Sequence, residues 1–199
     1  MKEFWDTRYA EIDFAYGKTP NTFFKDSIDK LTPGKLLLPA DGEGRNAVYA
    51  ATKGWDVTAV DMSESGKCKA LELASELGVN INYEVTNLID FHPEEQYDAI
   101  GLIYAHFPPE IRQDLHHKFI DVLKPGGKLI LEGFRPDQLN YHSGGPKTVE
   151  MLYPLTIIQE DFKDLEVEMA EEQNILLNEG RYHQGEAAVT RFIAVKPEL

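Results

Sequence analysis

The chain has 199 residues, of which 42% are hydrophobic and 27% charged, and its formal net charge is −14. This length favours one domain with a real core, and a single cysteine excludes a disulfide framework and a cysteine-rich zinc site. The negative charge argues against a nucleic-acid partner, no apolar run approaches the ~20 residues that span a bilayer, and the N-terminus lacks an apolar signal segment, which predicts a cytoplasmic location.

Short apolar runs alternate with amphipathic segments along the chain, which predicts an α/β fold. Helices are expected at residues 19–31, 47–52, 63–77 and 109–123. Strands are expected at residues 35–38, 55–60, 81–85, 97–104 and 128–133. Residues 165–177 and 187–195 form two more extended segments, and their short connection makes them antiparallel. The sequence therefore predicts a Rossmann-like, doubly wound, mostly parallel seven-stranded sheet with a C-terminal antiparallel hairpin.

A glycine-rich turn follows the first predicted strand. Residues 42–47 read Gly-Glu-Gly-Arg-Asn-Ala, which fits the pattern G-x-G-x-x-G/A between a strand and a helix. Glycine lets the backbone approach a ligand closely, and the N–H groups of a helix start favour an anionic group. Asp61 closes the next strand about twenty residues on, where its carboxylate can accept both hydroxyls of a ribose. The combination predicts a site for an adenosine-containing cofactor; the alternative is a tight turn beside an exposed aspartate.

The turn alone fits a nicotinamide cofactor as well as S-adenosylmethionine, and three other features favour the methyl donor. The C-terminal hairpin is the first, because dinucleotide-binding folds continue with parallel strands. The second is the stretch Leu123–Gly127 before the fifth strand. The third is Val85–Leu88, which offers a side-chain amide and backbone groups to the edge of an adenine.

These segments resemble the class I S-adenosylmethionine-dependent methyltransferases, and most of all the small bacterial group that includes tellurite-resistance and thiopurine-type methyltransferases. The residues that carry the resemblance are Leu36–Asn46, Asp61–Ser63, Asn87–Leu88, Tyr97–Ile100 and Leu123–Gly127, together with the opening segment Trp5–Tyr9, Tyr16–Gly17 and Pro20–Asn21. The resemblance covers nearly the whole chain. It implies an enzyme that transfers a methyl group from S-adenosylmethionine to a small-molecule acceptor, by positioning more than by strong acid–base catalysis.

The resemblance also implies how the cofactor is held. The glycine-rich turn wraps the methionine part, Asp61 holds the ribose and Met62 packs on the adenine. Asn87 meets the adenine amino group, and the Leu88 N–H meets a ring nitrogen. The expected cofactor-binding residues are Ala40, Asp41, Gly42, Glu43, Gly44, Arg45, Asn46, Asp61, Met62, Asn87, Leu88, Ile103 and Tyr104.

Two positions depart from the pattern of the family. The family usually has an acid at the end of the first strand, where it helps to hold the amino group of the cofactor, and this chain has Leu38 followed by Pro39. Asp41 or Glu43 is the expected substitute. The adenine-contacting position is often Asp and is Asn87 here, which is a mild change because an amide oxygen still accepts a hydrogen bond.

Tyr104 and His106 are the candidate catalytic residues. Both follow the fourth strand, at the edge where ligands bind in open α/β sheets. Methyl transfer from a sulfonium is an in-line displacement, so the protein mainly positions the nucleophile. His106 can take a proton and Tyr104 can orient the acceptor; the alternative for His106 is a packed or cofactor-contacting imidazole.

The whole chain is expected to form a single methyltransferase domain. Its parts are an N-terminal lid and helix at 1–34, a cofactor-binding core at 35–134, an acceptor-capping loop at 135–156 and the hairpin at 157–199. Arg8 and Tyr16 in the first part, and Tyr141 and His142 in the loop, are the candidate substrate or lid residues.

Three other side chains are given structural roles. His116 and His117 are adjacent on a helix, so they cannot share a metal ion, and both are expected at the surface. Cys68 is expected in the core. No His, Asp or Glu cluster has the spacing of a metal site, so no metal is expected.

Two alternative functions stay open. A nicotinamide-dependent oxidoreductase shares the glycine-rich turn and Asp61. A non-catalytic binding module would keep the fold while Leu38 and Pro39 weaken the cofactor site.

Overall fold

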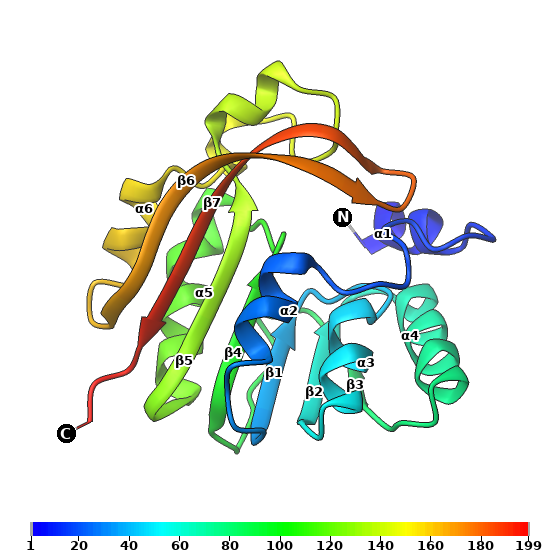
Figure 1. Ribbon diagram of the computed structural model, residues 1–199, viewed down its shortest axis with the longest axis horizontal. Helices are drawn as coiled ribbons and strands as arrows, with labels where there is room; N and C mark the ends of the chain where they lie inside the picture. Colours follow the sequence, from blue (N-terminus) through cyan, green and yellow to red (C-terminus); the bar gives the residue numbers. More distant parts are fainter. Residues whose placement is uncertain (1, 199) are drawn as a thin grey trace.

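A computed structural model describes residues 2–198, which form an α/β fold with helices on both faces of one sheet (Figure 1). The helices are α1 (Lys2–Tyr9), α2 (Thr22–Ile28), α3 (Arg45–Thr52), α4 (Glu64–Glu76), α5 (Pro109–Val122) and α6 (Leu155–Asp161), with short 3₁₀ helices at Pro136–Asn140 and Val149–Met151. The strands are β1 (Lys35–Pro39), β2 (Asp56–Asp61), β3 (Asn82–Val85), β4 (Tyr97–Ile103), β5 (Leu123–Phe134), β6 (Glu166–Glu179) and β7 (His183–Val195). Within this part of the chain, no helix combines the length and the apolar character that crossing a bilayer requires.

The sheet has seven strands in the order β3-β2-β1-β4-β5-β7-β6. Neighbouring strands from β3 to β5 are parallel, whereas β7 runs antiparallel to both β5 and β6. This confirms the predicted fold class. The order reverses between β1 and β4, and an open α/β sheet binds its ligands at the carboxyl ends of the strands beside such a point.

Alternate residues of the parallel strands serve two separate cores, because successive side chains of a strand point to opposite faces. Leu37 and Ile100 belong to the cluster that packs against α5 and α6. Leu36 and Leu38 belong to the cluster that contains Phe24 of α2 and the alanines of α3. Figure 1 shows α2 and α3 in front of the sheet and α5 behind it. The hydrophobic side chain of Leu38 therefore fills the core and does not face a ligand.

The hairpin β6–β7 curves over the carboxyl end of the sheet towards α1 (Figure 1). Both strands are longer than expected, and the turn between them meets the N-terminal segment. The Tyr182 N–H donates to the Ala15 carbonyl at 3.2 Å, and a Cβ added to Gly180 would lie 2.4 Å from the Gly17 nitrogen. The N-terminal segment and the turn between β6 and β7 thus close one side of the space above the sheet.

Three features differ from the sequence-based expectations. Residues 155–161 form α6 where a loop and a hairpin were expected; Ile158 and Phe162, four residues apart, bury its inner face. His116 is fully buried, with Nδ1 2.8 Å from Asp161 and its ring stacked on Phe162, so the expected surface position is wrong. Cys68 is exposed and does not belong to the core.

Candidate functional site

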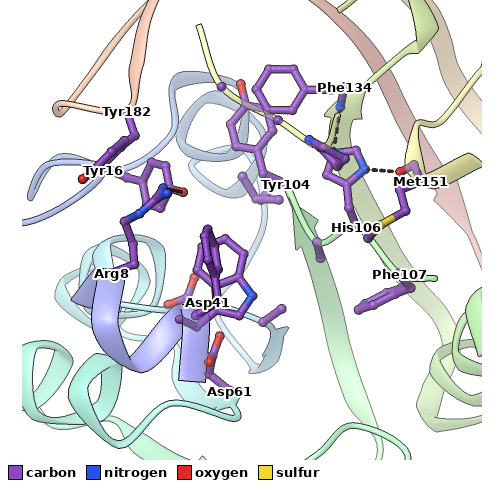
Figure 2. Close-up of a pocket in the computed structure, with 18 of the residues that line it drawn as sticks. Arg8, Tyr16, Asp41, Asp61, Tyr104, His106, Phe107, Phe134, Met151 and Tyr182 are labelled. Carbon is purple, nitrogen blue, oxygen red and sulfur yellow. Dashed lines mark hydrogen bonds between the residues drawn. The ribbon is translucent and has the colours of Figure 1, made fainter. Parts of the chain in front are cut away.

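A cavity of about 770 Å³ lies over the carboxyl ends of β1, β2 and β4. Its wall is completed by α1, by the loop after β5 and by the start of β7. Figure 2 shows the residues that face it, with Asp61 at one end and Tyr104, Phe134 and His106 at the other. Parts of the chain up to 180 residues apart in sequence therefore contribute to one space.

The glycine-rich turn is built by the backbone and closed by neighbouring side chains. Gly42 has φ of +59° and Gly44 has φ of +79°, conformations that favour glycine. The Gly42 N–H donates to Asp61 Oδ2 at 3.1 Å, and the Tyr83 hydroxyl donates to the Gly42 carbonyl at 2.5 Å. Gly44 packs so closely on Ala70 that an added Cβ would lie 2.4 Å away. Of the seven turn residues expected at the cofactor, Ala40, Asp41, Arg45 and Asn46 line the cavity, whereas Gly42, Glu43 and Gly44 support them from behind.

Two carboxylates face the cofactor end of the cavity. Asp61 is 7% exposed, and its oxygens accept the N–H groups of Gly42 and Ser63, at 3.1 and 3.0 Å. Burial raises the pKa of Asp61 to about 6. Asp41 accepts the Ala47 N–H at 3.2 Å, and burial raises its pKa to about 7. Each oxygen keeps a further lone pair for a ligand that donates hydrogen bonds.

Glu43 is engaged elsewhere and does not line the cavity. It accepts the Ala15 N–H at 2.8 Å and pairs with Lys69 at 2.8 Å, so it fastens the N-terminal segment to α4. Of the two acids that could replace the missing one at Leu38, only Asp41 reaches the cavity.

The apolar wall of the same end comes from three strands. Met62, Leu88 and Ile103 line it, together with Asn87. Asn87 Oδ1, the atom expected to accept from the adenine amino group, accepts the Ile89 N–H at 3.1 Å and keeps one further lone pair. The amide NH₂ group has no partner among the described residues.

The helix α1 covers the cavity from the N-terminal side. Asp6 accepts the Ser63 hydroxyl at 2.6 Å and so fixes α1 to the start of α4. The Arg8 guanidinium lies over the Tyr182 ring, 3.8 Å from its centroid, and donates to the Tyr16 hydroxyl at 3.3 Å (Figure 2). Arg8 has no carboxylate within 4.0 Å among the described residues, so its charge is available to a ligand.

His106 holds the loop after β5 with both ring nitrogens. Nδ1 lies 2.7 Å from the Met151 carbonyl, which can only accept, so Nδ1 carries the proton. Nε2 accepts the Phe134 N–H at 3.0 Å (Figure 2). Burial lowers the pKa of His106 to about 4. No ring nitrogen is left for the base role that the sequence suggested, and the packed alternative describes His106 better.

Tyr104 is held in a strained conformation at the end of β4. Its φ is +53°, which is uncommon for a residue with a side chain. Its N–H donates to the Glu132 carbonyl at 2.7 Å, and its hydroxyl donates to the Glu132 carboxylate at 2.9 Å. Its ring stacks on Phe134, with 4.6 Å between the centroids. Tyr104 thus presents its ring to the cavity. Its hydroxyl proton points to Glu132 and is not available to a methyl acceptor in the cavity.

The loop at 135–156 caps the far end of the cavity. Of its two expected cavity residues, Tyr141 and His142, only one lines the cavity. His142 lines the cavity, as do the residues from Gly144 to Thr148 and Met151. Tyr141 does not; its hydroxyl lies 3.5 Å from Asn174 on β6. Several residues that the sequence analysis did not single out also line it, namely Phe134, Arg181, Tyr182, His183 and Gln184. The only sequence signal for Phe134 is its position after the predicted strand at 128–133. The only signal for the other four is that they follow Gly180.

Comparisons with known protein sequences point to one enzyme class. A family model described as "Methyltransferase domain" matches residues 39–127. Thiocyanate methyltransferase 1 of Brassica oleracea is 27% identical over 156 residues, which cover 75% of this chain and 68% of that protein. The protein of the same name from Arabidopsis thaliana is 27% identical over 132 residues, 64% of this chain and 57% of its own length.

Solved structures share the fold across nearly the whole chain. TehB from Haemophilus influenzae has a TM-score of 0.74 at 18% identity, over 98% of this chain and 66% of its own. A structure described as "Conversion of a Disulfide Bond into a Thioacetal Group during Echinomycin Biosynthesis" has a TM-score of 0.80 at 16% identity, over 99% and 92%. The N-methyltransferase NodS from Bradyrhizobium japonicum, in complex with S-adenosyl-L-homocysteine, has a TM-score of 0.71 at 14% identity, over 98% of each chain.

Proposed function

We infer, from the premise that this chain is a class I S-adenosylmethionine-dependent methyltransferase, that it transfers the methyl group to the sulfur atom of a small acceptor. The observation that carries this proposal is a single cavity with carboxylates at one end and cations and aromatic rings at the other. Its volume of about 770 Å³ lies in the upper part of the ~300–1,000 Å³ range of pockets for drug-sized ligands. That leaves room for a small second molecule beside the cofactor.

The residues at the carboxylate end suit S-adenosylmethionine. Asp61 would accept the ribose hydroxyls, and Asp41 would meet the ammonium group of the methionine part. Met62, Leu88 and Ile103 would enclose the adenine, and Asn87 would face its edge. The bound cofactor supplies an electrophilic methyl group, so the protein needs to position the acceptor and exclude water.

The other end of the cavity suits a soft or anionic acceptor. Arg8, Lys147 and Arg181 are among the residues that line the cavity, and Arg181 also pairs with Glu11 at 3.5 Å. Asp41 and Asp61 line it as well, after β1 and at the end of β2. The rings of Tyr16, Tyr104 and Phe134 offer polarizable surface. The plant relatives are named for thiocyanate, an anion that can attack through sulfur. A sulfur nucleophile fits this combination of positive charge and aromatic wall.

A methyl-transfer screen tests the proposal. The full chain is incubated with S-adenosylmethionine carrying a deuterated methyl group, and with thiocyanate, alkyl and aryl thiols, amines and oxyanions in parallel. We expect deuterated methyl on sulfur acceptors, detected by mass spectrometry, together with S-adenosylhomocysteine. Transfer to amines alone, or to no acceptor, would contradict the proposal.

The raised pKa of Asp41 makes cofactor binding depend on pH. Because its folded pKa of about 7 exceeds the ~3.9 of an unfolded aspartate, Asp41 favours folding of the free protein at low pH and opposes it as pH rises towards 7. An ammonium ligand needs the ionised form. We therefore expect the affinity for S-adenosylhomocysteine to fall about tenfold for each pH unit below 7, with a smaller added loss below 6 from Asp61.

Calorimetric titrations between pH 5.5 and 8 measure this dependence. Asp41→Asn should bind more weakly at pH 8 and lose the part of the slope that lies between pH 6 and 7. A variant with the slope of the wild type would show that another group titrates.

The nicotinamide alternative shares the glycine-rich turn and Asp61, but the pair of residues that a short-chain oxidoreductase would use lies away from the cavity. Residues 49–53 read Tyr-Ala-Ala-Thr-Lys, the Tyr-x-x-x-Lys spacing typical of short-chain oxidoreductases. The Tyr49 hydroxyl donates to Asp29 at 2.7 Å, and neither Tyr49 nor Lys53 lines the cavity.

A further inference from the structure

We propose that His183, at the start of β7, is the general base that removes the proton from a protonated acceptor. This inference rests on the proposed function, because it concerns the acceptor end of the same cavity. His183 is 4% exposed and lines that cavity. It received no role from the sequence, and Glu179 and His183 meet only because β6 and β7 pair with these two residues opposite each other.

A carboxylate fixes the tautomer of His183. Nδ1 lies 3.2 Å from Glu179 Oε2. Glu179 in turn pairs with Arg45 at 2.9 Å and accepts from the Asn21 amide at 3.2 Å, so its position is set from three directions. Burial alone would raise the pKa of Glu179, but the His183 and Arg45 contacts lower it to about 2. An ionised carboxylate only accepts hydrogen bonds, so Nδ1 carries the proton and Nε2 keeps its lone pair.

Nε2 is free and reachable from the cavity. It has no hydrogen-bond partner among the described residues. The fully buried side-chain N and O atoms without a partner in the same part of the chain are Trp55 Nε1, His116 Nε2 and Arg135 Nε. Since His183 Nε2 is not one of them, it keeps access to the space that the residue lines. Gly144 packs against this edge, and a larger residue there would collide with it, because a Cβ would lie 2.6 Å from His183 Cδ2 and 3.1 Å from Nε2.

Aromatic rings hold the imidazole in place. Its centroid lies 4.4 Å from that of Tyr16, 4.7 Å from Tyr104 and 5.4 Å from Phe134. These rings come from the N-terminal segment, β4 and β5. The free nitrogen therefore sits in the aromatic chamber where the acceptor is proposed to bind.

The surroundings keep His183 neutral at physiological pH. Burial lowers its pKa, and Arg45 and Arg8 add to this, while Glu179 opposes it. The other titratable groups that face it are Tyr16, Tyr104, Tyr182 and His106, which are neutral in this range. A neutral imidazole is the form that accepts a proton.

The other histidines of the cavity are less suited. Both nitrogens of His106 are bonded to backbone groups. His142 is exposed on the capping loop, and no hydrogen bond to a carboxylate fixes its ring within the described chain.

The step balances without a further reactant. His183 Nε2 takes the proton of an acceptor thiol as the thiol sulfur forms its bond to the methyl carbon. The former carbon–sulfur bond breaks, and its electron pair remains on the leaving sulfur. The proton on His183 is then released to solvent. An acceptor that is already an anion does not need this step.

Two acceptors separate the role of a base from that of a structural residue. Thiocyanate carries no proton near neutral pH, whereas a thiol is mostly protonated there, the cysteine side chain having a pKa of ~8.5. At pH 7, His183→Gln should lower kcat/KM for 2-mercaptoethanol by about 30-fold or more, because about 3% of a thiol with a pKa of ~8.5 is ionised there, and leave that for thiocyanate within about twofold. In the variant, the rate with the thiol should rise about tenfold per pH unit up to the pKa of the thiol. In the wild type it should level off above the pKa of His183.

The matched control is His92→Gln, because His92 is exposed and lies outside the cavity. This substitution should leave kcat/KM unchanged for both 2-mercaptoethanol and thiocyanate. Equal losses for thiol and thiocyanate in His183→Gln would overturn the proposal and make His183 a structural residue.

A readout without turnover separates this inference from the proposed function. Long-range ¹H–¹⁵N correlation of the histidine side chains, assigned with His183→Gln, should show a neutral His183 with its proton on Nδ1 at pH 7. A proton on Nε2 would overturn the assignment of the base. If the wild type methylates no sulfur acceptor, the proposed function fails, and the NMR result alone decides whether His183 has the free nitrogen of a base.

Discussion

Replacing Asp61 with alanine should weaken binding of S-adenosylhomocysteine by about 10²- to 10⁴-fold, because two charge-assisted hydrogen bonds of about 1.5–3 kcal/mol each are lost. Asp61 ends β2 and lines the cavity, and its remaining lone pairs are the acceptors in place for two ribose hydroxyls. Calorimetric titration of both proteins at pH 8 measures the change. At that pH the carboxyl, with a pKa of about 6, is ionised.

Asp61 also accepts two backbone N–H groups, so the folded state of the variant has to be checked by its melting temperature. Asp61→Asn keeps one side-chain oxygen and should show a smaller loss of affinity. The control is Asp56→Ala, at the exposed opposite end of the same strand, which should bind as the wild type does. A folded Asp61→Ala protein with unchanged affinity would show that Asp61 does not hold the ribose.

Replacing Glu132 with alanine should lower the free energy of unfolding by about 3–5 kcal/mol, because a partner is removed from a buried ion pair. Glu132 is fully buried on β5 and accepts from Arg191 at 2.5 Å, Asn21 at 2.6 Å and Tyr104 at 2.9 Å. Its loss removes an acceptor from three donors, of which Asn21 keeps Glu179 and Arg191 keeps Gln173 as a second partner. For a chain of this length, each kcal/mol lowers Tm by about 2–4 °C.

Chemical denaturation of paired variants tests the cause of this loss. Glu168 on β6 forms an exposed ion pair with Lys128 on β5. Glu168→Ala should therefore change the free energy of unfolding by less than about 0.5 kcal/mol. Glu132→Leu combined with Arg191→Met should be more stable than Glu132→Leu alone, because no charge is then left buried. If Glu132→Ala is no less stable than Glu168→Ala, the buried network does not stabilise the protein.

The parallel core of the sheet and one end of the cavity could be predicted because their signals are local. The strand, turn, helix and acid around Asp61 occupy a short stretch in which residue types alone set the backbone. The structure places Asp41, Asp61 and Leu88 along one cavity, as the spacing suggested. What these residues bind stays a proposal.

The acceptor end could not be predicted, because it depends on pairing between distant strands. Glu132 lies opposite Arg191 only after β7 has paired with β5. Glu179 and His183 face each other across the turn of the predicted hairpin, but the hairpin register that sets them opposite each other cannot be derived from the sequence. Nothing near His183 in the sequence distinguishes it from the other histidines. His106 has the expected strand-end position, yet the loop from Phe134 to Met151 folds back and occupies both of its nitrogens.

Helix faces explain the remaining errors. Cys68 was expected in the core because it lies three residues before Leu71, but Leu71 is itself 42% exposed. The buried face of α4 is formed by Gly66, Ala70, Leu73 and Ala74, and all but Leu73 are small residues that give a weak apolar signal. On α5, His116 lies between the buried Leu115 and Phe119 and is turned towards Asp161, a partner on a helix that the sequence did not predict.

Every role proposed for the cavity residues requires the cavity to bind S-adenosylmethionine. Calorimetric titration of the wild-type chain with S-adenosylhomocysteine, and with NADH in parallel, tests this most directly. We expect one-to-one binding of S-adenosylhomocysteine at pH 8 and no heat from NADH. Binding of NADH alone would replace the methyl donor with a nicotinamide cofactor. Binding of neither would mean that Leu38 and Pro39 mark a site that has lost its cofactor.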